Sequence, residues 1–285
     1  MISDITLGQF FPGFSPLHKL DPRTKILLSI AFIAAVFVAN NPISFFALTA
    51  IVIVMVAISR ISFRVIMKGL KPIVFILIFT ALLNIFLTKG DTLLFGWKFI
   101  EIYLEGIVRA VFMAFRVVLL IVGTSMLLTY TTSPIALTDG IESLLSPLKV
   151  IKVPVHSFAM MMSIALRFIP TLVEETERIM NAQKSRGADF TTGNIFKRTK
   201  ALVPLLVPLF VSSFKRADEL ATAMECRCYR GDKNRTKLVK LTFHPMDFVW
   251  MMIFAIILAA VICSRIIPYN FEVDNLIYNI IFFRI

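Results

Sequence analysis

Long apolar segments separated by polar connections constrain this chain more than any other feature of its sequence. Hydrophobic residues make up 58% of the 285 residues, against 17% charged residues. A soluble globule of this size could not cover such a composition with polar surface. The sequence therefore predicts an integral membrane protein.

Its five expected spans are residues 26–39, 42–58, 72–87, 107–129 and 246–263. The first two are shorter than the roughly 20 residues of a full crossing unless polar flanks extend them.

Polar residues mark the ends of the expected spans and the interior of one of them. Asp21 before Pro22 predicts a helix start. The aspartate side chain can accept a hydrogen bond from a backbone N–H of the first turn, and proline fits position N1 because a backbone N–H there would have no partner within the helix. Residues 89–105 are expected to form a loop or a short hairpin. Arg109 and Arg116 lie inside the fourth span, where charge is costly in lipid, so they should face protein or water.

The longest stretch outside the spans covers residues 131–245 and is basic. The prolines that interrupt it are Pro147, Pro154, Pro170, Pro204 and Pro208. Its apolar pieces, 157–166 and 202–210, are too short to cross a membrane, so we expect them at the interface or packed under the bundle. The expected domains are a bundle of four spans (1–130), a cytoplasmic domain (131–245), and a last span with a C-terminal tail (246–285).

Positive charge is distributed unevenly among the connections. If the N-terminus, the 59–71 connection and residues 131–245 share one side, 24 of the 30 Lys and Arg lie on that side. Cytoplasmic connections carry an excess of these residues. The sequence therefore predicts a multi-pass cell-membrane protein with a cytoplasmic N-terminus and a C-terminus outside. Residues 276–285 are apolar but short, and we expect them at the membrane surface.

Two stretches within the basic segment have the periodicity of amphipathic helices. In residues 172–187, apolar or weakly polar side chains recur every three or four residues, and charged side chains take the other face. Residues 214–228 repeat this design. Superposing Arg186 on Arg227 gives a weak internal repeat with an offset of 41 residues. Two similar helices suggest two similar docking partners.

The end of the first amphipathic helix has a structural explanation as well as a functional one. Ser185-Arg186-Gly187 can be a helix stop, because glycine takes the left-handed conformation at C′ and a cation suits the negative end of the helix dipole. A short motif of this kind also matches by accident easily. The functional interpretation therefore depends on the rest of the sequence.

The sequence lacks the motifs of common catalytic and metal sites. It contains no G-x-x-x-x-G-K-[ST] phosphate loop, no H-E-x-x-H and no G-x-S-x-G serine elbow. The three histidines are far apart, and Cys226-x-Cys228 is spaced too tightly for a usual zinc knuckle. We therefore expect no enzyme activity, no cofactor and no metal. The net charge of +12 is attributed to the cytoplasmic side of a membrane protein and not to nucleic-acid binding.

Three ordered motifs give the chain a family resemblance. They are Leu20-Asp-Pro-Arg23-Thr-Lys25, then Ala165-Leu-Arg-Phe-Ile-Pro170 leading to Ala182-Gln-Lys-Ser-Arg186-Gly187, and Arg216-Ala-Asp-Glu-Leu-Ala-Thr-Ala-Met-Glu-Cys-Arg227. Together they resemble the transmembrane T component of energy-coupling factor (ECF) transporters, the vitamin and metal-ion importers of prokaryotes, over nearly the whole chain. The resemblance implies an all-α integral membrane protein with about five transmembrane helices plus a cytoplasmic domain of amphipathic coupling helices.

The resemblance also implies partners and site residues. In that family two coupling helices each end in an Ala-Arg-Gly signature that docks on one of two ABC-type ATPases, while the membrane face binds a substrate-capturing S component. The residues carried over by position are Ser185, Arg186, Gly187, Glu225, Cys226, Arg227 and Cys228. In the second signature only the arginine matches, and Tyr229-Arg230-Gly231 follows at once. Arg227 is favoured over Arg230 because it continues from Ala223-Met224-Glu225 as the motif does.

The predicted function is therefore that of a non-enzymatic coupling subunit, which transmits ATP hydrolysis in partner ATPases to a substrate-binding S component in the lipid bilayer. One alternative is a self-contained secondary transporter or channel with Arg109 and Arg116 along an anion path, but this predicts inverted repeats that the spans do not show. Another is a membrane-embedded enzyme, for which Asn84 and these two arginines are too few. The substrate itself is left open, because the S component sets it in this family.

Overall fold

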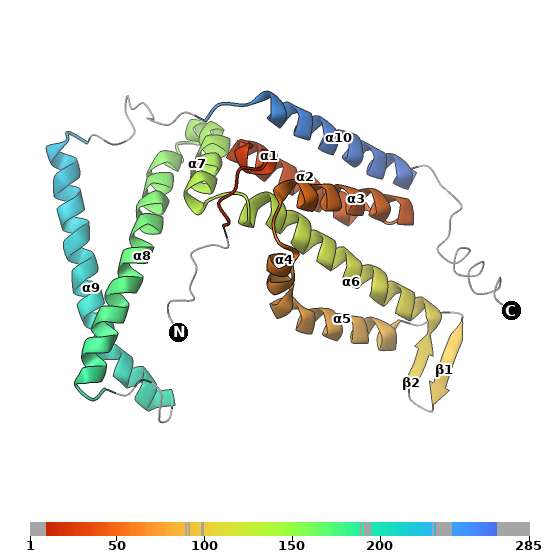
Figure 1. Cartoon of the computed structure of the whole chain (residues 1–285), viewed down its shortest axis with the longest axis horizontal. Helices are drawn as coiled ribbons and strands as arrows, with labels where there is room; N and C mark the ends of the chain where they lie inside the picture. The colour runs from red at the N-terminus through yellow and green to blue at the C-terminus, as the bar shows by residue number, and fades with distance from the viewer. Residues whose placement is uncertain are drawn as a thin grey trace. The chain divides into compact units, whose positions relative to one another are not determined.

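The computed structural model describes residues 10–88, 90, 92–97, 100–188, 190, 195–229, 231 and 241–266. They form two compact units, whose elements are labelled in Figure 1. The span unit consists of described residues 10–133 and 241–266. The helix-pair unit consists of described residues from 134 to 231.

Several helices of the span unit begin at a proline. α2, α3 and α10 each start at a proline. Proline has no backbone N–H, and in the first turn of a helix that N–H would have no partner within the helix. Asp21 Oδ1 accepts from the backbone N–H of Arg23 at 2.9 Å, which confirms the predicted N-cap. The helices are α1 (Pro16–Lys19), α2 (Pro22–Val38), α3 (Pro42–Ser59), α4 (Phe63–Leu70), α5 (Val74–Leu87), α6 (Leu104–Thr124) and α10 (Pro245–Ile266). A 3₁₀ turn, η1 (Lys71–Ile73), joins α4 to α5, and a π turn, η2 (Ser125–Thr129), extends α6.

The core of the span unit lies between α2, α3, α6 and α10. Its buried cluster includes Phe32, Leu48, Met55, Leu127, Trp250 and Phe254. A Cβ atom at Gly123 of α6 would collide with the ring of Phe32 on α2. The close approach of these two helices therefore requires glycine at position 123.

The five apolar segments expected to span the membrane are all helical. In the described part of the chain, four helical segments are long and apolar enough to cross a membrane: Phe63–Leu87, Leu104–Thr129, Val155–Ser185 and Pro245–Ser264. The first of them reaches this length only when α4 and η1 are counted with the 14-residue α5. Ser44–Ser59 is a shorter apolar helix. α2, with 17 residues, is below the roughly 20 residues of a full crossing. Large apolar side chains such as Phe75 and Leu87 are 77% and 72% exposed, as expected of helices that face lipid or another membrane protein.

Residues between the third and fourth spans form a hairpin, so the short-hairpin expectation is confirmed for the residues that the structure describes there. Strand β1 (Leu93–Trp97) pairs antiparallel with β2 (Ile100–Tyr103). The Glu105 carboxylate accepts from the backbone N–H of Thr92 at 3.1 Å and from its hydroxyl at 2.8 Å. These bonds fasten the hairpin to the first turn of α6.

The helix-pair unit consists of α7 (Pro134–Leu145), a 3₁₀ turn η3 (Ser146–Ile151), α8 (Val155–Ser185) and α9 (Ile195–Cys226). The expectation that prolines break this region into short pieces is wrong at three positions. Pro170 lies inside the 31-residue α8, and Pro204 and Pro208 lie inside the 32-residue α9. A proline removes one backbone hydrogen bond and bends a helix, and the remaining turns hold it together. Residues 157–166 and 202–210 therefore belong to continuous helices. The expectation that residues 157–166 are too short to cross a membrane is also wrong by length and composition, because α8 as a whole is long and apolar enough.

Candidate functional site

α8 ends in a Schellman motif that is built by backbone amides. The N–H of Ala188 donates to the carbonyl of Gln183 at 3.0 Å, and the N–H of Gly187 donates to the carbonyl of Lys184 at 2.9 Å. Gly187 has a φ of 85°, the left-handed conformation that this motif needs at its C′ residue. The predicted helix stop is thus confirmed for the backbone.

α9 ends in the same motif. The N–H of Tyr229 donates to the carbonyl of Met224 at 3.0 Å, and the N–H of Cys228 donates to the carbonyl of Glu225 at 2.8 Å. Cys228 takes the left-handed position with a φ of 56°. The motif places Arg227 where α8 has Arg186, at the 41-residue offset of the sequence repeat. Arg230 lies outside the described residues.

The predicted site residues all lie at the surface of the described chain. Ser185, Arg186, Gly187, Glu225, Cys226, Arg227 and Cys228 are all exposed. Within the described chain the guanidinium groups of Arg186 and Arg227 make no hydrogen bond or ion pair. Backbone amides alone satisfy the helix ends, so both arginine side chains remain available to another molecule.

A polar clasp joins α8 to α9. The carboxylate of Glu175 forms an ion pair with Arg216 and accepts from the hydroxyl of Ser212 at 3.0 Å. Glu175 and Arg216 are separated by 41 residues, the offset that also relates the two helix ends. Equivalent points of the repeat therefore meet where the helices touch. Each terminal arginine lies eleven residues beyond its half of the clasp, about 16 Å along its own helix at 1.5 Å per residue.

The two helices of the pair run in opposite directions, as Figure 1 shows for the green α8 and the cyan α9. Their C-terminal ends consequently lie at opposite ends of the pair. The arrangement presents two similar arginine-bearing tips at separate places and does not gather them into a single pocket.

The start of α8 is fixed by a side-chain hydrogen bond that the sequence did not reveal. His156 Nδ1 lies 2.9 Å from the carboxylate of Glu142 on α7. This contact orients α8 within the helix-pair unit. Glu175, Ser212 and Arg216 were also missed as partners. The only available signal was that Glu175 and Arg216 are equivalent in the repeat, which indicates similarity and does not by itself indicate contact.

The first resemblance motif lies in the span unit and is structural there. Lys25 is 2% exposed, and its Nζ donates to the carbonyls of Thr131 at 2.9 Å and His18 at 3.2 Å. Asp247 is fully buried and accepts from the backbone N–H groups of Asp21 at 2.9 Å and His244 at 2.7 Å. These bonds join the start of α2 to the start of α10 and to the end of α6.

Arg23 completes this network at the surface. Its guanidinium pairs with Asp21 at 3.0 Å, donates to the carbonyl of Leu241 at 2.8 Å, and lies over the ring of Phe243 with 4.3 Å to the centroid. The motif therefore anchors α10 against α2.

The two arginines of the fourth span have different surroundings. Arg116 donates to the carbonyl of Ala39 at 2.6 Å and lies over the ring of Phe45, so it caps the C-terminal end of α2. This agrees with the expectation that it faces protein. Arg109 is exposed beside Asn84, in a hollow that also includes Leu83 and Thr88. The two side chains do not form a common anion path in the span unit, because one of them is engaged in capping.

Comparison with known proteins gives consistent matches over most of the chain. The CbiQ family model, described as cobalt transport protein, matches residues 13–238. The energy-coupling factor transporter transmembrane protein EcfT of Clostridium kluyveri is 52% identical over 267 residues, which cover 93% of this chain and 98% of that protein. EcfT of Ruminiclostridium cellulolyticum is 55% identical over 247 residues, covering 87% and 92%. EcfT of Bacillus subtilis is 49% identical over 262 residues, covering 92% and 98%.

These matches confirm the family resemblance and, with it, the fold class of a helical, multi-pass integral membrane protein. The residues that the family model matches include Lys25, the clasp and both arginine-bearing helix ends. The chain is a transporter membrane subunit, and it belongs to the family of energy-coupling factor transporter transmembrane proteins.

Proposed function

We propose that this chain is the coupling subunit of an importer, which transmits ATP hydrolysis by two ABC-type ATPases to a substrate-binding membrane S component. The observation that carries the proposal is the pair of matching helix ends, each with an exposed arginine that has no partner in the described chain. The proposed docking residues are Ser185, Arg186, Gly187, Glu225, Cys226, Arg227 and Cys228.

The chemistry of the tips supports docking on an acidic groove. A guanidinium offers a rigid fork of donors that can pair bidentately with a carboxylate and stays charged when partly desolvated. A Cβ atom at Gly187 would have no neighbour within 4 Å, so the tip of α8 leaves open space for a partner wall. Lysine would present a point charge without this geometry.

The geometry of the pair supports two partners and mechanical transmission. Two tips that are each about 16 Å from the clasp can reach two ATPases. The ion pair of Glu175 with Arg216 holds the helices together between the tips. A displacement of one tip is then transmitted along a continuous helix to the other members of the unit.

Apolar exposure on α9 supports a membrane partner. Val203, Val207, Phe210 and Phe214 are 51%, 57%, 68% and 65% exposed. An exposed apolar patch of this kind marks a contact with another protein or with lipid. We assign it to the S component, which would select the carried vitamin or metal ion. The chain itself holds no phosphate loop, so ATP hydrolysis is assigned to the partner ATPases.

The decisive experiment removes both arginines. Removing one partner of a desolvated charge pair costs about 2–5 kcal/mol, a roughly 30- to 5,000-fold loss of affinity. Arg186→Ala/Arg227→Ala should therefore abolish co-purification with the ATPases and abolish uptake, while membrane insertion is retained. The matched control is Lys184→Ala/Lys215→Ala, which removes two charges from exposed positions of the same helices and should have little effect. A double arginine variant that assembles and transports at the wild-type rate would show that these residues only end helices.

Orientation is part of the proposal: the N-terminus and the helix-pair unit are cytoplasmic, and the C-terminus is outside the cell membrane. The uneven charge distribution supports it. Residues 1–9 and 267–285 lie outside the described residues. Cys226, Cys228 and Cys263 are free and exposed, so variants that keep either the first two or only the last can be labelled in intact cells. An impermeant thiol reagent that labels Cys226 or Cys228 from outside would contradict this orientation.

Nucleotide handling gives a separate test. The purified chain should neither bind nor hydrolyse ATP and should support ATPase activity only in the assembled complex. Saturable ATP binding by the isolated chain, measured by equilibrium dialysis, would refute a role that depends on partner ATPases.

A further inference from the structure

Unmatched positive charge gathers where α3, α4 and α5 meet. The four side chains are those of Arg60, Arg64, Lys68 and Lys71, and all are exposed. The sequence contains no Asp or Glu between Asp21 and Asp91. Within the described residues none of the four forms an ion pair or a side-chain hydrogen bond. The charge of this cluster is therefore not neutralised by the described chain.

α4 is turned away from the apolar helices beside it. Figure 1 shows α2, α3, α5, α6 and α10 following a shared direction, and α4 crossing it before the bend at η1. The bend coincides with Pro72, which fits the 3₁₀ turn of Lys71–Ile73. If the apolar helices cross the bilayer, α4 lies along its surface, and the 14-residue α5 enters the membrane without it.

The side chains of α4 form the stripes of an interfacial helix. Ile66 is 4% exposed and packs against Met126 and Tyr130, which fixes one face to the span unit. Phe63 and Met67 form an apolar stripe and are 70% and 50% exposed. The neighbouring positions 64, 68 and 71 carry the basic side chains. Such a helix buries its apolar stripe near the acyl chains and keeps its cations at the level of the headgroups.

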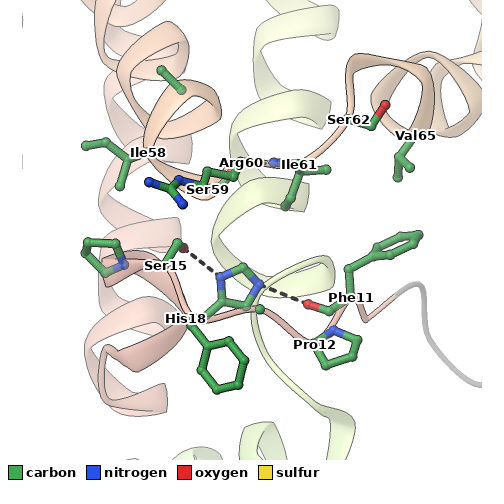
Figure 2. A pocket seen from close by; sticks show the side chains of 14 residues that line it. Phe11, Pro12, Ser15, His18, Ile58, Ser59, Arg60, Ile61, Ser62 and Val65 are labelled. Carbon is green, nitrogen blue, oxygen red and sulfur yellow. Dashed lines mark hydrogen bonds between the residues drawn. The ribbon is translucent and has the colours of Figure 1, made fainter.

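An open pocket of about 840 Å³ adjoins the N-terminal end of α4. One wall is residues 11–16 and the other is the α3–α4 connection of residues 57–62. Figure 2 shows the His18 ring between Ser15 and Phe11, with Arg60, Ile61 and Ser62 along the connection that faces it. The lining combines an exposed cation, hydroxyl groups and apolar side chains. Phe14 is 96% exposed.

The positive charge in this pocket comes from Arg60 and not from the histidine. His18 Nδ1 lies 2.7 Å from the Ser15 hydroxyl, and Nε2 lies 2.9 Å from the carbonyl of Phe11. Burial lowers the pKa of His18 below its usual 6.5, against the raising effect of the bond to Phe11, and the nearby Lys25 lowers it further, which favours the neutral ring. Arg60, at a φ of 55° after the end of α3, is the nearest fixed cation in the lining.

We propose that α4 and this pocket bind the phosphate headgroup of an anionic phospholipid at the membrane surface. Arg60 contacts the phosphate, Arg64, Lys68 and Lys71 supply the surrounding positive field, and Phe14, Phe63 and Met67 contact the acyl chains. A bound anionic lipid would neutralise the cluster and hold α4 in the plane of the bilayer, at the hinge between α3 and α5.

The test is lipid binding by the full-length chain purified in neutral detergent. Native mass spectrometry should show phosphatidylglycerol retained in preference to phosphatidylcholine, whose headgroup adds a compensating cation. Each basic residue near an anionic surface contributes about a fivefold gain in affinity, so Arg60→Gln/Arg64→Gln/Lys68→Gln should weaken phosphatidylglycerol binding about 100-fold. Arg60→Gln alone should produce the largest single loss.

Matched variants separate this site from general effects of charge. Lys152→Gln/Arg178→Gln/Lys215→Gln removes three exposed cations from the helix-pair unit and should leave phosphatidylglycerol binding unchanged. Arg60→Lys/Arg64→Lys keeps the charge and should retain binding, which reports on folding independently. Three outcomes would each overturn the proposal. They are equal binding of the two lipids, full competition by soluble glycerol phosphate, and wild-type binding by the triple glutamine variant.

Discussion

Two groups of charged residues in this protein differ in their burial and in whether they bond to other groups of the chain. Lys25 and Asp247 are buried, and their polar atoms bond to groups of the same chain. Arg186 and Arg227 are exposed at helix ends, and their guanidinium groups have no partner among the described residues. The first group stabilises the fold of the span unit, and the second remains available for binding.

The contrast shows why charge alone does not identify a functional residue. Burying an ion is tolerated only when hydrogen bonds satisfy it, so removing one member of a buried network destabilises the chain. An exposed, unpaired arginine contributes little to the stability of the fold, but it can contribute much of the binding free energy of an interface. The first change below should therefore affect stability, and the second should affect assembly.

The largest effect on stability is expected at Asp247. Asp247→Ala leaves the amides of Asp21 and His244 without their acceptor and removes a negative charge near buried Lys25, so unfolding should become easier by about 3–5 kcal/mol. Thermal unfolding of the purified chain in detergent measures this. Asp218→Ala, at an exposed position on α9, is the control and should change stability by less than about 0.5 kcal/mol. Equal stability of both variants would mean that the buried network does not fasten α10.

The next effect concerns assembly and the register of the second signature. Arg227→Ala and Arg186→Ala should each weaken association with the ATPases by about 2–5 kcal/mol, because the two residues occupy the same position in equivalent helix ends. Arg230→Ala should have a much smaller effect. Affinity can be measured by surface plasmon resonance with the reconstituted subunits. If Arg230→Ala weakens binding more than Arg227→Ala, the geometric equivalence does not determine which arginine docks.

A smaller effect is expected from the residues that end the two helices. Cys228→Gly should stabilise the helix end by about 1 kcal/mol, because a side chain at a positive φ is strained and glycine is not. Gly187→Ala introduces the same strain into α8 and should cost about as much. Paired denaturation curves compare them. A loss of stability in Cys228→Gly would show that the thiol makes a contact that outweighs the strain.

The smallest effect is expected at the clasp. The side chains of Glu175 and Arg216 are 26% and 34% exposed, so Glu175→Gln should cost only about 0.5–1 kcal/mol. The charge reversal Glu175→Arg/Arg216→Glu should recover most of the transport that Glu175→Arg alone loses. Failure of the reversal, with assembly intact, would show that this pair does not hold the two helices at their contact.

Several local features could be predicted from the sequence. Asp21 before Pro22 predicts an N-cap, and Asp21 accepts from the N–H of Arg23. The offset between Arg186 and Arg227 predicts equivalent helix ends, and the same backbone bonds are found at both. Each of these features depends on residues a few positions apart, where caps and periodicity act.

Other features depend on tertiary structure. The prolines of α8 and α9 suggest breaks, but both helices continue through them. The bond from Asp21 to Asp247 joins residues 226 positions apart, and no periodic pattern indicates that pairing.

The sequence by itself determined that this protein is a helical membrane subunit with two similar arginine-ended helices, because apolar length, periodicity and capping are local properties. Only the tertiary structure decided which charged side chains are buried, which are paired and which stay exposed. It buried Lys25 and Asp247 in a network, paired Glu175 with Arg216, and left Arg186, Arg227 and the cations of α4 exposed. The physical reason is that the cost of burying a charge depends on the partners that the fold brings to it, and those partners come from distant parts of the chain.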